Sequence, residues 1–152
     1  PAGHVIYNNY SKVAAASDIT NDATWRNATN IFITVPAAIC NTLSSIIVHM
    51  TYYMLIYKGT DPHHFASSRI ARTAPGSVVG TLGQSLNSGQ NGGDVGSGTS
   101  TPIYSTCSNC VVDEDITNAD HTYYLQGYAN DGYCGALNPA TTGANITVWG
   151  IK

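Results

Sequence analysis

Residues 144–151 read Ala-Asn-Ile-Thr-Val-Trp-Gly-Ile, so apolar and polar side chains alternate along this stretch. A period of two residues is typical of a β-strand that buries one face. One face is expected to carry Ile146, Val148 and Gly150, and the other Asn145, Thr147, Trp149 and Ile151. The pattern closes the sequence, and it predicts a final strand docked inside a sheet.

A second long strand is predicted over residues 46–57, where Ile, Val, Met and Tyr side chains dominate. A buried helix is the alternative for such an apolar run, but the β-branched and Tyr content favours a strand. The run stops at residues 58–62, Lys-Gly-Thr-Asp-Pro, which is a strong turn signal. Residues 29–35 form an earlier predicted strand that Pro36 closes.

Shorter β segments complete the pattern. Residues 63–72 are expected to pair back across the 58–62 turn, and residues 77–82, 111–112 and 121–129 form further predicted strands. About eight strands separated by turn residues, with no crossover helix, predict an all-β fold. We expect an antiparallel, jelly-roll-like β-sandwich in a single domain spanning residues 1–152.

Residues 83–101 consist mainly of Gly, Ser, Asn and Gln. Such a segment buries too little apolar surface to offset the entropy of ordering it. We therefore expect a long flexible loop that a partner can order. A linker between two half-domains is the alternative, although the flanking strands look like parts of one sheet system. Residues 1–12 are a candidate amino-terminal arm.

Charged side chains make up 10% of the chain, whereas about a quarter of the residues are charged in a typical globular domain. The formal net charge is −3. A surface of neutral hydrogen-bonding groups suits an extracellular or virion protein. The few cations are scattered apart from Arg69 and Arg72, which form one cationic spot, so nucleic acid is not an expected partner. No signal peptide is visible, and no apolar run is long enough for a bilayer, so no membrane partner is expected.

The order of segments resembles the small jelly-roll domains of tailed-phage virions, namely trimeric capsid decoration (cement) proteins, head fibres and tail-fibre tips. These domains share a shape with C1q and tumour-necrosis-factor domains. The resemblance covers most of the chain except residues 76–106. It is carried by residues 1–6, 30–36, 41–48, 57–60, 122–126 and 145–151.

The resemblance implies a homotrimer that buries apolar faces between protomers. Such a trimer would sit on a virion assembled in the host cytoplasm, against the major capsid protein or another virion protein. The family supplies no catalytic residues, and the four cysteines are not part of its pattern.

Cys107-Ser108-Asn109-Cys110 is the sharpest local motif. With Cys40 and Cys134 it provides enough thiols for a tetrahedral zinc site, so Cys107 and Cys110 are candidate zinc ligands. The second Cys-x-x-Cys pair of a zinc site is missing, as is the βαβ context of redox motifs. Disulfides and small core residues are the other interpretations. No cofactor is expected.

Two further groups of polar residues are candidate sites. Asp113-Glu114-Asp115, with Asp120, is expected to be a solvated acidic turn, and calcium binding is the alternative. His49 lies inside the most apolar strand, where a satisfied core or interface histidine is more common than a metal ligand. No pattern of a catalytic nucleophile, base or phosphate loop appears, so catalytic residues are not expected.

Ten tyrosines and two tryptophans are the more informative feature, because such rings combine a large rigid area with a polar tip. The predicted interface anchors are Trp25, Tyr52, Tyr53, Tyr57 and Trp149, with Tyr52 facing away from Tyr53 and Tyr57. The first hypothesis is a non-enzymatic virion protein acting through homotrimer and capsid contacts. A carbohydrate-binding domain, lectin-like or receptor-binding, is the alternative. A hydrolase ranks last.

Overall fold

The chain is built almost entirely of strands in the computed structural model, which describes residues 3–13, 17–19, 25–58, 66–72, 84–85, 89–90, 103–129, 132–137 and 143–152. The strands are β1 (Val5–Val13), β2 (Ser17–Ile19), β3 (Arg26–Val35), β4 (Ser45–Lys58), β5 (Ala66–Arg72), β6 (Gln84–Ser85), β7 (Gly89–Gln90), β8 (Ile103–Asp113), β9 (His121–Ala129), β10 (Gly132–Leu137) and β11 (Ala144–Ile151). One short helix, α1 (Ala37–Cys40), lies among the described residues. None of the described helical segments has the length and apolarity to span a bilayer.

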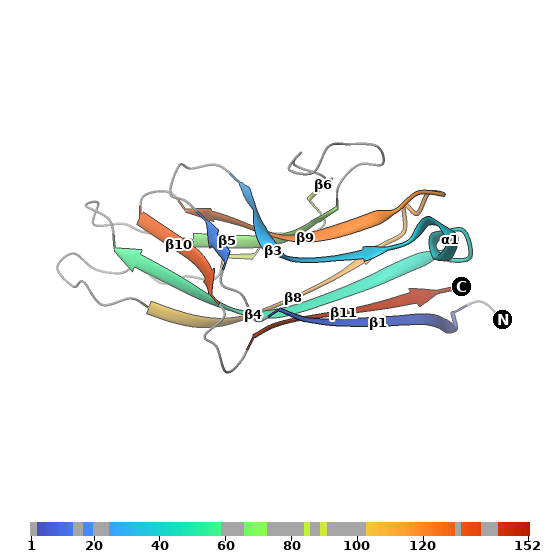
Figure 1. Ribbon diagram of the computed structural model, residues 1–152, viewed down its shortest axis with the longest axis horizontal. Coiled ribbons are helices and arrows are strands. Elements are labelled where there is room, and N and C mark those ends of the chain that lie inside the picture. Colours follow the sequence, from blue (N-terminus) through green and yellow to red (C-terminus); the bar gives the residue numbers. More distant parts are fainter. Residues whose placement is uncertain are drawn as a thin grey trace.

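Two antiparallel sheets face each other (Figure 1). Sheet A has the order β1-β11-β4-β10-β2, with β8 on the opposite side of β4, and sheet B has the order β3-β9-β5-β6, with β7 also paired to β5. The long β4 pairs first with β11 and then with β10. The pairs β1·β11, β3·β9, β4·β8 and β5·β6 are nested in sequence and alternate between the sheets, which is the jelly-roll arrangement. The predicted antiparallel β-sandwich is confirmed.

Alternate side chains of the strands fill the space between the sheets. In β11 the burial alternates along the whole strand, with Ile146 and Val148 fully buried, as the sequence predicts. The core also receives Ile31, Ile33 and Val35 from β3, Ile46, Val48 and Met50 from β4, Ile70 from β5, and Tyr123 and Leu125 from β9. Burial of each such side chain contributes roughly 1.5–3 kcal/mol, so the alternation in the sequence specifies which face of each strand points inward.

The strand predicted over residues 63–72 is observed in part as β5, but it does not pair back onto β4. It pairs with β9 in sheet B, so the chain passes from one sheet to the other between β4 and β5. The turn residues 58–62 indicate a change of direction, and they carry no information about which sheet receives the next strand. The expected hairpin is therefore wrong.

Three other segments differ from expectation. β8 begins at Ile103, so Val111 and Val112 lie near the end of a long strand, and the Cys107–Cys110 motif lies within it. Residues 5–12 of the candidate arm belong to β1, an edge strand paired with β11. Within the predicted loop 83–101, the short strands β6 and β7 are described; the rest of that loop and the strand predicted at 77–82 lie outside the described residues.

The two ends of the described chain lie side by side at the α1 end of the sandwich (Figure 1). The Gly3 N–H donates to the Lys152 carbonyl, and the Lys152 N–H donates to the His4 carbonyl at 3.0 Å. Gly150 makes the close packing there possible, because a Cβ at this position would lie 2.7 Å from the Leu43 side chain.

Candidate functional site

The outer face of sheet A, which we call face A, is formed by the outward side chains of β1, β11, β4 and β8. All of its members are exposed or half-buried. They are Asn8, Tyr10, Lys12, Asn145, Thr147, Trp149, Ile151, Ser45, Ile47, His49, Thr51, Tyr53, Thr106, Ser108, Cys110 and Val112. The face thus runs without interruption across the four strands.

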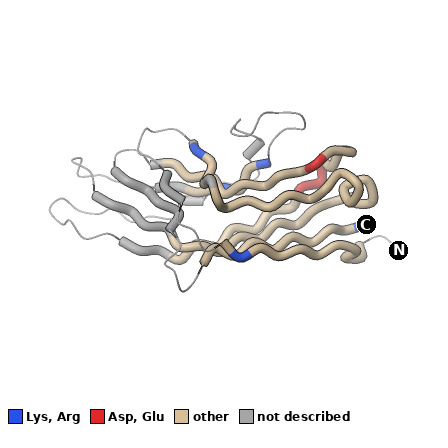
Figure 2. The backbone as a smooth tube through the Cα atoms, viewed as in Figure 1, with Lys and Arg blue, Asp and Glu red and all other residues tan. Residues whose placement is uncertain are grey.

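Formal charge is almost absent from face A, where Lys12 is the only Lys, Arg, Asp or Glu among these sixteen residues. The described acidic residues instead gather near the α1 end (Figure 2). Exposed apolar side chains are concentrated on the same strands: Val5, Ile6 and Tyr10 of β1 are 49–57% exposed, and Val112 of β8 is 55% exposed. Depletion of charge together with exposed apolar and aromatic groups is typical of the centre of a protein interface.

Neutral polar groups on face A are held in rows across the strands. The Tyr10 hydroxyl donates to Asn145 Oδ1 at 2.7 Å, and Asn145 Nδ2 donates to Thr51 Oγ1 at 3.4 Å. His49 Nε2 lies 2.8 Å from the Ser108 hydroxyl, and its ring stacks against Trp149 at a centroid distance of 6.5 Å. A shallow hollow of about 250 Å³ opens beside these rows, lined by Thr51, Tyr52, Tyr53, Thr106, Gly143 and Asn145.

The outer face of sheet B carries a different group, which we call patch B: Trp25, Asn27, Arg69, Gln126 and Tyr128. The Arg69 guanidinium lies 4.1 Å from the centre of the Trp25 ring, and the Trp25 ring lies 5.5 Å from that of Tyr128. Arg69 Nε donates to Gln126 Oε1 at 2.6 Å, and Gln126 Nε2 donates to Asn27 Oδ1 at 2.8 Å. A cation, two amides and two rings therefore form one connected group, in which Gln126 is fully buried and the other four side chains are half-buried.

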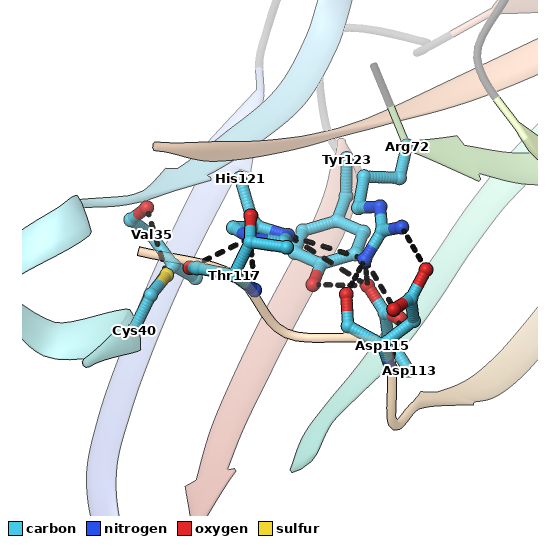
Figure 3. Close-up of polar contacts among 8 residues, drawn as sticks. All are labelled: Val35, Cys40, Arg72, Asp113, Asp115, Thr117, His121 and Tyr123. Carbon is cyan, nitrogen blue, oxygen red and sulfur yellow. Dashed lines mark hydrogen bonds and ion pairs between the residues drawn. The ribbon is translucent and has the colours of Figure 1, made fainter. Parts of the chain in front are cut away.

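A buried polar cluster lies between the sheets at the α1 end (Figure 3). Arg72 Nη1 of β5 donates to both carboxylate oxygens of Asp113, which ends β8, at 3.0 and 2.7 Å. The Tyr123 hydroxyl of β9 donates to Asp113 Oδ2 at 2.8 Å. Arg72 also contacts the carbonyl and carboxylate of Asp115. Arg72 and Asp113 are 5% and 2% exposed, so this ion pair joins the two sheets inside the protein.

His121 of β9 extends the cluster toward α1. Its Nδ1 lies 3.3 Å from Arg72 Nη1, and its Nε2 lies 3.1 Å from the Thr117 carbonyl. The Thr117 backbone N–H donates to Nε2 at 3.1 Å, so Thr117 and Arg72 contact the ring at its two nitrogens. The ring is 1% exposed, so these contacts lie inside the protein.

Burial raises the pKa of two acidic groups in this region. Desolvation, followed by the nearby Asp113 carboxylate, raises the pKa of Tyr123, which therefore keeps its proton and donates to that carboxylate. Desolvation also raises the pKa of Cys40, whose Sγ donates to the Val35 carbonyl at 3.5 Å. These groups lie inside the sandwich, where their contacts hold strands together.

A second buried polar group bridges the sheets in the middle of the core. The Tyr52 hydroxyl of β4 is hydrogen-bonded to the Ser68 hydroxyl of β5, and Asn109 Nδ2 of β8 donates to the Tyr52 oxygen at 2.8 Å. Tyr52 is 2% exposed. Its expected role as an interface anchor is therefore wrong, because its position in the alternation of β4 directs it inward, away from Tyr53.

The other predicted anchors are divided between the two outer faces. Trp149 and Tyr53 lie on face A, and Trp25 lies in patch B. For Tyr57 the structure gives the backbone pairing with Tyr133 only, and its side chain lies outside the described part. The sequence does not show which sheet each strand joins, so it does not separate these rings into two groups.

The proposed thiol site is not formed by the described cysteines. Cys107 is buried and Cys110 is exposed, because residues three apart on a strand point to opposite faces. No disulfide joins Cys40, Cys107 and Cys110 to one another, and no group of three or more metal-ligating side chains occurs among the described residues. The Cys134 side chain lies outside the described part.

Sequence reasoning also missed the buried cluster. Residues 113–115 are expected from the sequence to be a solvated turn, but Asp113 is buried and paired with Arg72. The signal was the strand alternation itself: Asp113 follows Val111 and Cys107 on the inward face of β8, and Arg72 follows Ile70 on that of β5.

No protein-family model and no curated protein matches this sequence. Among solved structures, the chain is similar to that of the infectious bursal disease virus Gt strain, with 10% identity, 97% of this chain and 38% of that chain covered, and a TM-score of 0.42. It is also similar to the VP2 subviral particle of the same virus, with 9% identity, 96% and 38% coverage, and a TM-score of 0.40. The chain thus spans less than two fifths of either chain. The likeness is distant, and the jelly-roll assignment rests on the strand order itself.

Proposed function

We propose that this protein is a structural component of a virus particle, which associates with copies of itself through face A. The observation that carries the proposal is the nearly uncharged outer surface of β1, β11, β4 and β8. On an isolated sandwich this surface leaves Tyr10, Val112 and neighbouring apolar groups in water. A second copy that covers the face removes this apolar area from water at little cost in desolvated charge.

The resemblance of the segment order to trimeric phage domains favours a homotrimer as the form of this association. His49 and Thr147 are directly paired in the register of β4 and β11 and lie in the middle strands of face A. In a symmetric assembly the middle of the face is buried most deeply. The low overall charge, 10% of residues, also suits a particle component that touches capsid neighbours through polar neutral groups.

Capsid decoration or a fibre component is the finer role that we propose, with the major capsid protein or another virion protein as the second partner. Apolar contacts between protomers would stabilise the trimer, and the Asn- and Thr-rich surface would contact the capsid shell. We propose the virion as the protein's location on the same grounds. No catalytic step is part of this role.

The test is the mass of the native complex in solution for the parent chain and for Thr147→Glu. The parent chain is expected to form trimers at micromolar concentration. A carboxylate at position 147 would be desolvated in the assembly with only the His49 imidazole beside it, which costs at least about 3 kcal/mol and weakens association more than a hundredfold. The variant should therefore be monomeric under the same conditions.

Ala38→Glu is the matched control, because it adds the same charge at an exposed position of α1 away from face A. This control should remain assembled. A parent chain that is monomeric at high micromolar concentration refutes self-association through face A. Dissociation by both variants would show that net charge, and not the location of the carboxylate, controls assembly.

A further inference from the structure

Patch B contains Arg69, whose charge is not balanced by an acid among the described residues. In the described part of the chain, Arg69 has one hydrogen bond, from Nε to Gln126, and its guanidinium stacks on Trp25. Its two Nη groups make no hydrogen bond or ion pair with the described residues. Burial lowers the pKa of Arg69 by desolvation, which shows that its charge is held at a cost. An anion brought to the Nη groups would recover that cost.

The orientation of Arg69 is fixed by its neighbours. Gln126 is fully buried, and its amide is itself held by Asn27 at 2.8 Å, so the Nε contact is anchored to the sheet. Trp25 supports the face of the guanidinium. An arginine fixed in this way presents its outer edge as a planar fork of N–H donors, which matches the two oxygens of a carboxylate.

Apolar rings lie on the same face of sheet B. Phe32 is 43% exposed and contacts the Tyr124 ring at 5.5 Å, and Tyr124 lies two residues from Gln126 on β9. Phe32 and Arg69 lie on opposite sides of β9, about 10 Å apart across the strands and about 7 Å apart along them. An oligosaccharide lying across β9 could thus contact the Phe32 ring with one sugar and reach Arg69 with the carboxylate of another.

We propose that patch B, with Phe32, binds a saccharide that carries a carboxylate. Arg69 would take the carboxylate through its Nη groups, Asn27 would face ring hydroxyls, and Phe32 would cover the apolar face of the sugar. A protein partner is the competing occupant of a surface with Trp, Tyr and Arg. The saccharide is favoured because the exposed rings are few and are separated by fixed polar groups. The site lies on the sheet opposite face A, so it does not depend on self-association.

The experiment follows the two indole N–H signals of the ¹⁵N-Trp-labelled protein, since the chain has two tryptophans. Trp149→Phe assigns the signal of Trp25. The probes are sialyllactose and tri-galacturonic acid, with lactose and maltotriose as neutral counterparts. The acidic probes should shift the Trp25 signal and leave that of Trp149 in place, and the neutral probes should bind at least tenfold more weakly.

Two substitutions test the role of Arg69. Arg69→Gln should weaken binding of the acidic probes at least tenfold. Arg69→Lys, which keeps the charge but loses the planar fork, should give a smaller loss. Lys152→Gln removes one positive charge at an exposed position outside patch B and face A, and it should bind like the parent chain.

Several outcomes would overturn the proposal. It falls if neither acidic probe moves the Trp25 signal at about 10 mM, a concentration that would reveal even millimolar affinity. Equal binding of lactose and sialyllactose would remove the role of the carboxylate, and unchanged binding by Arg69→Gln would remove that of the arginine. A Trp25 signal that responds to self-association or to capsid protein, and to no saccharide, would identify patch B as a protein interface.

Discussion

Asp113 and Asp115 both pair with Arg72, but their side chains are 2% and 79% exposed, so their removal should have very different effects. Asp113→Asn keeps the shape of the side chain and removes its charge. The buried guanidinium and the Tyr123 hydroxyl then face an uncharged amide. Breaking a buried ion pair in this way costs about 3–5 kcal/mol.

The same change at Asp115 should have a much smaller effect. Its carboxylate is in water, and exposed ion pairs contribute about 0–1 kcal/mol. The Asp115 carbonyl that Arg72 also contacts is unaffected by the substitution. For a chain of this size, 1 kcal/mol corresponds to about 2–4 °C in Tm, so Asp113→Asn should lower Tm by about 6–20 °C and Asp115→Asn by less than about 4 °C.

The assay is urea and heat unfolding at one fixed protein concentration, because assembly makes apparent stability depend on concentration. The double variant Arg72→Met with Asp113→Asn should be more stable than the sum of the two single losses predicts, because no buried charge is left alone. Equal losses for Asp113→Asn and Asp115→Asn would refute the structural role of the buried pair.

Ionisation, packing and exposure of single groups should have three further measurable effects. The folded chain holds the Tyr123 proton because its pKa is raised from the ordinary 10.0, so the free energy of unfolding should fall as the pH rises above about 10. Tyr123→Phe should reduce that slope by up to about 1.4 kcal/mol per pH unit in urea titrations. Gly150→Ala should cost about 1–3 kcal/mol in the same assay, since the added methyl group meets Leu43. In monomeric Thr147→Glu, mass spectrometry should find Cys110 alkylated much faster than the buried Cys107.

A Tyr123→Phe slope equal to that of the parent above pH 10 would show that the hydroxyl ionises as readily in the folded chain. Full stability of Gly150→Ala would mean that Leu43 moves away without loss. In the parent assembly Cys110 should be protected, because it lies on face A; equal labelling of Cys110 in parent and monomeric variant would count against that interface.

The sequence predicts the strands that have one buried face, because apolar alternation records burial locally. β11 and β4 follow the expected pattern closely. The pairing of β5 with β9 could not be predicted, because residues 66–72 and 121–129 are brought together by the whole topology and by no local signal. Arg72 and Asp113 are 41 residues apart, and each looks like an ordinary surface residue until both strands are placed. Patch B likewise draws on β3, β5 and β9, so its members could be named from sequence only as separate residues.

The meeting of residues 3–4 with residue 152 has a practical consequence for the chain as a building block. Because these backbone groups are already hydrogen-bonded to each other, a short linker could join them, and new ends could be opened at an exposed position elsewhere. A circular permutant made in this way should retain the nested pairing of the jelly roll. For the same reason the whole sandwich could be inserted into a surface loop of a host protein, with both connections leaving from one point.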